Sequence, residues 1–246
     1  MNRVYISFII SLFAGLSTAL GGLIVYVRFK NKNKFISFSL SFAASIMLSL
    51  SVLELFPESF IKIASIYYGL GIVMSIIFFI LGILLVKIIN KKTPLFGNDL
   101  YRVGVMSMIA LILHNIPEGI ATFMASYNNI NDGLALGIAI MMHNIPEGIS
   151  IAVPIALSRK SNKRGVIYSL VAGLSEPLGG LLAYLLFKEY INDITISIVL
   201  LIVSGIMISI SINELLPESF KYDNKRETII GFILGLIAVI FTLFIL

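Results

Sequence analysis

The sequence predicts an all-α, polytopic membrane protein with eight transmembrane helices. The chain of 246 residues is 58% hydrophobic, only 13% of its residues are charged, and its mean hydropathy is +1.00. This composition excludes an ordinary soluble domain. Eight apolar runs reach the length of about 20 residues that a helix needs to cross a bilayer. Basic residues also gather in every second connection between these runs, as in polytopic proteins.

The eight runs follow one another with short connections and leave almost no room for a domain outside the membrane. The predicted spans are 5–27, 36–57, 64–89, 101–126, 133–157, 165–187, 193–217 and 227–246. The first run has Arg3 before it, as a signal peptide would, but it has no clear small-residue cleavage site, so we expect it to be retained. The chain has no cysteine, which excludes disulfides and argues against a Cu(I) site or a thiolate zinc site.

The charges on the connections predict how the chain is oriented. Of the 18 Lys and Arg residues, 15 lie after spans one, three, five and seven, and only Arg3, Lys62 and Lys188 lie on the other side. The basic side is expected to be cytoplasmic, which puts both termini outside a cell (plasma) membrane. The same clustering accounts for the net charge of +5. The expected partner of the basic residues is therefore the lipid bilayer, and no nucleic acid is expected.

An internal repeat predicts how the spans are grouped. Residues 11–30 match residues 169–188 at 13 of 20 positions, and residues 45–60 match residues 205–220 at 10 of 16. Spans one and two thus correspond to spans six and seven, and spans three and eight complete the two halves by position. The halves enter the membrane from opposite sides, which makes the repeat inverted. This 3+2+3 arrangement is typical of transporters, whose site lies near the membrane midplane.

The whole chain is therefore predicted to form one transmembrane transporter domain, 1–246. Its first repeat covers about 1–95, a central pair of spans covers about 100–158, and the second repeat covers about 165–246.

The central pair carries the motif HNIPEG twice, at 114–119 and 143–148. In a helix, the histidine and the glutamate four residues later share a face, and the asparagine borders it. Imidazole, amide and carboxylate groups on facing helices suit a divalent metal. The candidate ligands are His114, Asn115, Glu118, His143, Asn144 and Glu147. Because Pro117 and Pro146 lack an N–H, we also expect a kink and an unpaired carbonyl in each helix.

Carboxylates inside the predicted spans are the second indication of a metal. They are Glu54, Glu118, Glu147, Glu176 and Glu214. Ionised carboxylates are costly in this environment unless they are paired. A divalent cation between them keeps them ionised, so metal binding should compete with protons.

Four further residues are candidates, either on weaker grounds or for separate reasons. Glu176 precedes Pro177 in mid-span, and the repeat has Thr18 at its counterpart, so the charge does not follow from the repeat itself. Glu54 and Glu214 lie near span ends, where they either reach interfacial water or serve as relay points on opposite membrane faces. Met47 offers a thioether sulfur, although a methionine in an apolar helix usually packs in the core.

The two motifs and the Glu-Pro pair resemble the ZIP (Zrt/Irt-like) family of metal transporters, in particular its bacterial ZupT-type members. The resemblance covers the whole chain and implies a binuclear metal centre between spans four, five and six. It assigns one metal position to His114, Glu118, His143 and Glu147. It assigns the neighbouring position to Asn115, Asn144 and Glu176, with Glu118 and Glu147 bridging, and it puts Met47 near the site.

The resemblance also implies a function. It implies uptake of divalent metal into the cytoplasm, by movement of one helix bundle past another and in a homodimer. The mixed shell of histidine, asparagine and glutamate is compatible with zinc, iron, manganese or cobalt as the transported substrate.

Other functions stay open at this point. An exporter, or a proton-coupled antiporter of the same fold, would share these motifs and this topology, and a channel-like mechanism is also compatible with them. An intramembrane metalloenzyme such as a protease would need an HExxH-type pair and an open metal position that activates water. The sequence offers HNxPE instead, so we do not expect an enzyme.

Overall fold

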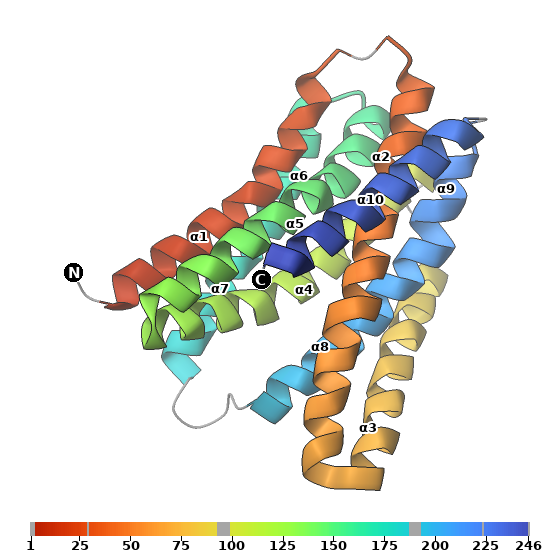
Figure 1. Cartoon of the computed structure of the whole chain (residues 1–246). Coiled ribbons are helices and arrows are strands. Elements are labelled where there is room, and N and C mark those ends of the chain that lie inside the picture. The colour runs from red at the N-terminus through yellow and green to blue at the C-terminus, as the bar shows by residue number, and fades with distance from the viewer. Residues whose placement is uncertain (1–2, 29, 93–98, 187–192, 223, 246) are drawn as a thin grey trace.

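The computed structural model describes residues 3–28, 30–92, 99–186, 193–222 and 224–245, and every regular element in these ranges is helical (Figure 1). Lys188, one of the three basic residues predicted to lie on the extracellular side, is not among the described residues. Seven helical segments are long and apolar enough to cross a membrane. The prediction of an all-helical, polytopic membrane protein is therefore confirmed.

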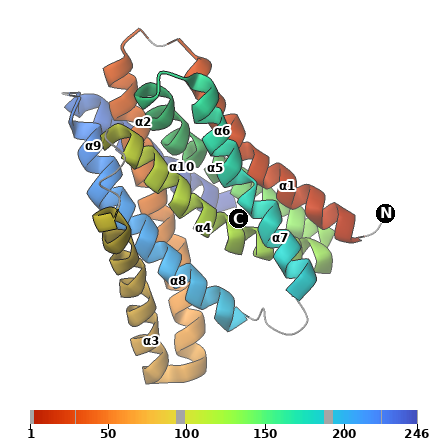
Figure 2. The same ribbon diagram turned by 180° about the vertical axis from the view of Figure 1, so that it is seen from behind.

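The helices form two groups, which Figures 1 and 2 show from opposite sides. The first, here called the site bundle, consists of α1 (Arg3–Gly22), α4 (Asp99–Asn128), α5 (Ile130–Ser158), α6 (Asn162–Gly173) and α7 (Ser175–Leu186). The second, here called the flanking bundle, consists of α2 (Lys32–Leu50), α3 (Phe56–Lys92), α8 (Asp193–Ile210), the short α9 (Leu216–Phe220) and α10 (Lys225–Ile245). The bundles meet mainly where α2 packs on α5 and α8 packs on α4.

One of the seven candidate segments, Lys32–Ile89, has 58 residues. At a rise of about 1.5 Å per residue it would be close to 90 Å long if straight, about three times the thickness of a bilayer core. The segment is not straight, because Tyr68 has φ 48° and ψ −127°. Figure 1 shows the chain turning back near the lower end of α3, so that the residues after the bend run beside those before it.

The helix that begins at Lys32 continues past residue 57, where the sequence analysis ended the second span, so no helix end marks that boundary. A π-helical turn, Ser51–Leu55, lies just before Pro57, and a matching turn, Ser211–Leu215, lies just before Pro217. In each turn, the backbone N–H of the residue that follows the turn donates to the carbonyl of the serine that begins it, five residues earlier. The wider turn gives room to the proline ring, which would otherwise clash with the carbonyl four residues before it.

The sixth predicted span, 165–187, is not one continuous helix. It divides into α6 and α7 at Leu174, shortly before Glu176 and Pro177. Pro177 cannot donate the hydrogen bond that would continue α6, and the break places Glu176 in the first turn of α7. By contrast, α4 and α5 remain helical through the prolines of their HNIPEG motifs, and the kinks expected there stay a prediction.

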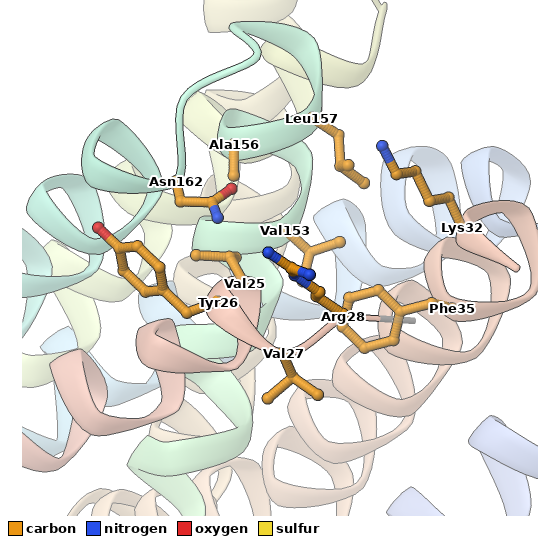
Figure 3. Close-up of a pocket in the computed structure, with 10 residues that line it drawn as sticks. All are labelled: Val25, Tyr26, Val27, Arg28, Lys32, Phe35, Val153, Ala156, Leu157 and Asn162. Carbon is orange, nitrogen blue, oxygen red and sulfur yellow. The ribbon is translucent and has the colours of Figure 1, made fainter. Parts of the chain in front are cut away.

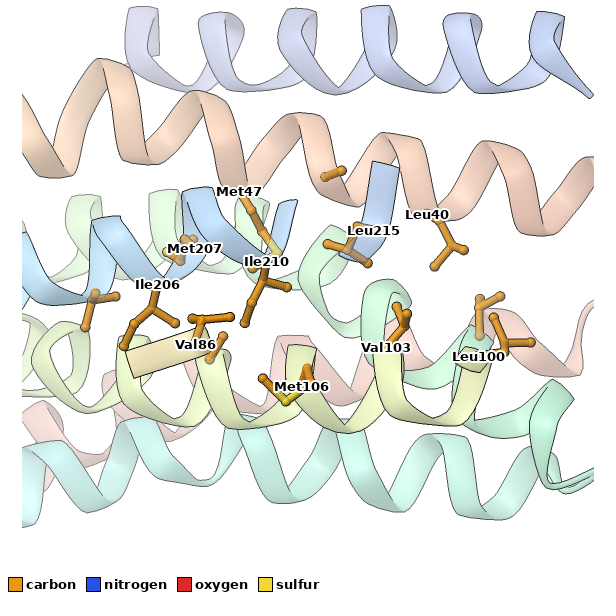
Figure 4. Close-up of a cluster of buried hydrophobic side chains, with 14 of the residues drawn as sticks. Leu40, Met47, Val86, Leu100, Val103, Met106, Ile206, Met207, Ile210 and Leu215 are labelled. Carbon is orange, nitrogen blue, oxygen red and sulfur yellow. The ribbon is translucent and has the colours of Figure 1, made fainter. Parts of the chain in front are cut away.

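A buried apolar cluster fills the space between the two bundles on one side of the motifs. It is built mainly from α2, the first half of α4 and the second half of α8, and it includes Met47, Met106, Met207 and Ile210 (Figure 4). All four side chains are at most 1% exposed. We call this set the central apolar cluster; it closes the gap between α4 and α8 with methionine and branched aliphatic side chains.

Candidate metal centre

The two HNIPEG motifs face each other because α4 and α5 form an antiparallel pair joined at Asn129, whose side chain caps α5 by accepting from the Asn131 amide. Glu118 Oε1 lies 3.0 Å from Nε2 of both His114 and His143. Glu147 Oε1 lies 3.8 Å from Nε2 of His114. The histidine and glutamate side chains thus lie on one face of each helix, as predicted, and the faces of α4 and α5 contact each other.

The histidine and glutamate side chains of the motifs are buried, and several of their polar atoms lack a hydrogen-bond partner among the described residues. His114, Glu118, His143 and Glu147 are all at most 8% exposed. Among the described residues, neither Glu147 oxygen has a hydrogen-bond partner, and neither do Glu118 Oε2 and His114 Nδ1. Ligand atoms of His114, Glu118 and His143 lie within 4.8 Å of one another. Buried carboxylates without partners are costly, whereas two imidazole nitrogens and carboxylate oxygens form a donor set that zinc favours.

The asparagines are held so that their oxygens stay available. Asn115 Nδ2 donates to the carbonyl of Ala172 at 3.2 Å, and Asn144 Nδ2 donates to the carbonyl of Ala14 at 3.1 Å. Asn144 Nδ2 also donates to Glu176 Oε2 at 2.9 Å. The two Oδ1 atoms and Glu176 Oε1 are left buried without a partner. Because these donors fix the orientation of both amides, their oxygens can serve as metal ligands beside Glu176.

The contacts of the two motifs match each other across the repeat. Ala14 and Ala172, which accept from the two asparagines, are repeat counterparts 158 positions apart. Gly148 of the second motif packs on the carbonyl of Thr18, and Gly119 of the first packs on the carbonyl of Glu176, again 158 positions apart. A Cβ on either glycine would overlap that carbonyl oxygen. The glycines therefore let α1 and α7 approach the motif helices closely.

A cavity of about 290 Å³ reaches the centre from one side. Glu118 and His143 are at its inner end, and Glu54 lines it together with Glu58 and Lys62. Glu54 thus shares this cavity with Glu118 and His143 of the motifs, and its role as a relay point stays a prediction. The sequence analysis missed Glu58 and Lys62; the signal for Glu58 was available, since the segment PESF occurs in both repeats.

Glu214, the repeat counterpart of Glu54, has a different environment. It is 5% exposed, and its Oε2 is 3.0 Å from Nη2 of Arg102, in the first turn of α4. It is not part of the His114, Glu118 and His143 group. The sequence analysis counted Arg102 as a loop cation and missed this pair, because no local pattern joins residues 112 positions apart.

A second ionic contact lies beside this pair. Lys221 Nζ is 2.8 Å from Asp99 Oδ2 and 2.8 Å from Glu218 Oε2, so it joins the start of α4 to the end of α9. The hydrogen bonds from Lys221 to Asp99 and Glu218 raise the pKa of Lys221 to about 12. This lysine is therefore charged at all physiological pH values and keeps the contact ionic.

Met47 packs in the central apolar cluster and has no exposed surface. Its neighbours there include Met207 and Ile210 (Figure 4). This environment is that of a core side chain.

Comparisons with known proteins agree on one family. A model of the family described as ZIP zinc transporter matches residues 98–244. The chain is 35% identical to a protein named zinc transporter ZupT from Clostridium perfringens, over 96% of this chain and 94% of that protein. Proteins of the same name from Oceanobacillus iheyensis and Streptococcus mutans are 34% and 36% identical, each over 96% of both chains.

Proposed function

Because the chain belongs to the ZIP zinc transporter family, we propose that it carries zinc across the membrane through the centre between α4 and α5. The observation that carries this proposal is the buried group of His114, Glu118 and His143, with the unpartnered carboxylate of Glu147 beside it. The family is one of transporters, so zinc is the cargo of this site and the chain is not an enzyme.

We propose that the chain crosses the membrane eight times and forms one domain over 1–246. In this topology Lys32–Ile89 crosses twice, with its turn at Tyr68, and the halves form a 3+2+3 inverted repeat. The matching contacts of the two motifs and the matching π-helical turns support the repeat. The 15-to-3 distribution of basic residues supports a cytoplasmic basic side and extracellular termini.

The centre is proposed to hold two metal positions. His114, Glu118, His143 and Glu147 form the first. Asn115, Asn144 and Glu176 form the second, with Glu118 and Glu147 bridging. The Oδ1 atoms of both asparagines and Oε1 of Glu176 support this division, because all three are buried without a partner among the described residues and Asn144 contacts Glu176 directly.

Zinc is proposed to move inward by exchange between two arrangements of the bundles. In the proposed orientation, the 290 Å³ cavity opens to the outside and ends at Glu118 and His143. The central apolar cluster and the Arg102–Glu214 pair lie on the cytoplasmic side and close it. Zinc would lose water in the cavity, with Glu54 attracting it, and bind at the centre. Sliding of α4 and α5 along α8 and α2 would then open the other side.

The test is zinc uptake by proteoliposomes that contain the purified protein. Glu118→Gln and Glu147→Gln keep the side-chain shape and remove the ligand charge. Mutation of a residue that only hydrogen-bonds to a metal ligand typically weakens metal binding about 10–100-fold. Loss of a direct ligand should therefore reduce zinc uptake by about 100-fold or more. Glu227→Gln is the matched control, because Glu227 makes an ion pair at the surface with Lys34 (Nζ to Oε1, 2.9 Å).

Each result of this test is informative. Uptake at the wild-type rate in both site variants would refute the assignment of the centre. Zinc that leaves loaded vesicles but does not enter them, or exchanges only against protons, would favour export or antiport. Inhibition of zinc uptake by iron, manganese or cobalt would extend the cargo to those ions. Cross-linking of two chains in the vesicles tests the homodimer that the resemblance implies.

A further inference from the structure

A second cavity, distinct from the metal path, lies at the end of the protein where α1 connects to α2. Its volume is about 550 Å³, within the range of small-molecule sites. One wall comes from residues between α1 and the start of α2, and the other comes from the end of α5 and Asn162 at the start of α6 (Figure 3). The residues of the first wall are Val25, Tyr26, Val27, Arg28, Lys32 and Phe35. The cavity therefore lies where the flanking bundle meets the site bundle.

Two cations without a protein counterion line this cavity. They are Arg28 and Lys32, and no acidic side chain in the described part of the chain pairs with either. The nearby Lys34 differs, since it pairs with Glu227 at 2.9 Å. Figure 3 shows the Arg28 guanidinium among Val25, Val153 and Phe35, and the Lys32 ammonium near Leu157. Two neighbouring cations exclude a metal ion and call for an anion.

The rest of the lining is apolar and continues to the membrane surface. Val25 lies on the same wall as the cations, and Val153, Ala156 and Leu157 of α5 form the wall that faces it. Tyr26 and Val27, at the rim, are each more than half exposed. A tyrosine and a valine exposed beside basic residues are typical of the membrane–water boundary, where anionic headgroups of the cytoplasmic leaflet concentrate. A soluble anion would gain nothing from these apolar surfaces.

We propose that this cavity binds the headgroup of an anionic phospholipid. The guanidinium of Arg28 makes paired hydrogen bonds to the phosphate, and the ammonium of Lys32 supplies the second charge. The Asn162 amide donates to the glycerol or phosphate oxygens, and the acyl chains leave the cavity along Tyr26 and Val27. A lipid held here touches Lys32 and Phe35 near the start of α2 and the end of α5 at once, so it bridges the two bundles.

The test is native mass spectrometry of protein released from nanodiscs that contain equal amounts of phosphatidylglycerol and phosphatidylcholine. We expect the wild type to retain phosphatidylglycerol selectively. Each of Arg28→Gln and Lys32→Gln should lower its retention about fivefold, and the double variant about 25-fold, since a basic residue near an anionic surface contributes about a factor of five. Lys87→Gln, which changes an exposed lysine of α3 outside the cavity, should retain lipid like the wild type.

A further variant tests whether lipid retention depends on the free space of the cavity as well as on its charge. Val27→Trp keeps both cations but places a larger side chain at the rim, and we expect it to lower retention without lowering zinc uptake. Equal retention in the wild type and the Arg28→Gln, Lys32→Gln double variant would overturn the proposal. Displacement of phosphatidylglycerol by inorganic phosphate at equal concentration would also overturn it, because the cavity would then be a site for a free anion.

Discussion

Replacing Gly148 by alanine tests whether the centre depends on close contact between α5 and α1. Gly148 follows Glu147 directly, and a Cβ there would overlap the carbonyl oxygen of Thr18 and approach the Gly22 amide nitrogen to 3.2 Å. Non-bonded heavy atoms are comfortable at about 3.5–4.0 Å, so α5 must move away from α1 by about 1 Å or more.

Both a stability cost and a functional loss follow from this displacement. Overpacking of a tight helix contact costs about 1–3 kcal/mol, which should lower the thermal unfolding temperature in detergent. A displacement of about 1 Å also carries Glu147 away from His114, and misplacement of a functional group on that scale can cost about 100-fold in rate. We therefore expect Gly148→Ala to reduce zinc uptake by at least about tenfold, measured as the initial rate in proteoliposomes.

Gly69→Ala is the matched control, because a Cβ at Gly69 meets no atom within 4 Å. An alanine in an open helical position favours the helix by up to about 1 kcal/mol, so this variant should unfold at the wild-type temperature or slightly above and take up zinc normally. If Gly148→Ala matched Gly69→Ala in both assays, the close contact would have no role and the reasoning would be refuted.

Three other predictions concern the centre and the Arg102–Glu214 pair. Asn144→Leu removes the amide that donates to Glu176 and should lower zinc uptake at least tenfold while the protein still reaches the membrane; normal uptake would show that the second metal position is not needed. Zinc uptake should fall as the external pH is lowered from about 7.5 to 5.5, because carboxylates and imidazoles bind metal only when deprotonated, and a flat pH profile would contradict this. Arg102→Gln should destabilise the protein by about 1–3 kcal/mol, because it removes the guanidinium that pairs with the buried Glu214 carboxylate. Adding Glu214→Gln should restore part of the unfolding temperature, and additive losses would argue against a direct interaction.

The general architecture follows from the sequence because the bilayer imposes it. A segment of about 20 apolar residues in a membrane can satisfy its backbone only as a helix, so hydropathy alone predicts the helical fold. The boundaries were less predictable. The helix that begins at Lys32 passes through Pro57 because a π-helical turn gives the ring room, and the sixth span breaks at Leu174 although its composition is apolar throughout.

The grouping of the side chains proposed for the first metal position could be predicted for a similar reason, whereas their binding of metal stays a prediction. His114 and Glu118 lie one helical turn apart, and the second copy of the motif supplies His143 and Glu147 with the same spacing, so residue type and period suffice. The orientation of the asparagine amides could not be predicted, because it depends on carbonyls of Ala14 and Ala172, which belong to other helices.

The sequence by itself determined that this is a helical membrane protein with a repeated motif of histidine, asparagine and glutamate, since hydropathy, charge distribution and helical spacing are local properties. The tertiary structure alone decided which distant groups meet. It paired Glu214 with Arg102, opened a cavity at Glu54, and placed Arg28 and Lys32 together in the lining of a cavity at a bundle boundary. Glu54 and Glu214 occupy the same position in the two repeats and have nearly the same neighbours in sequence. They differ in environment because α4 places its Arg102 beside only one of them.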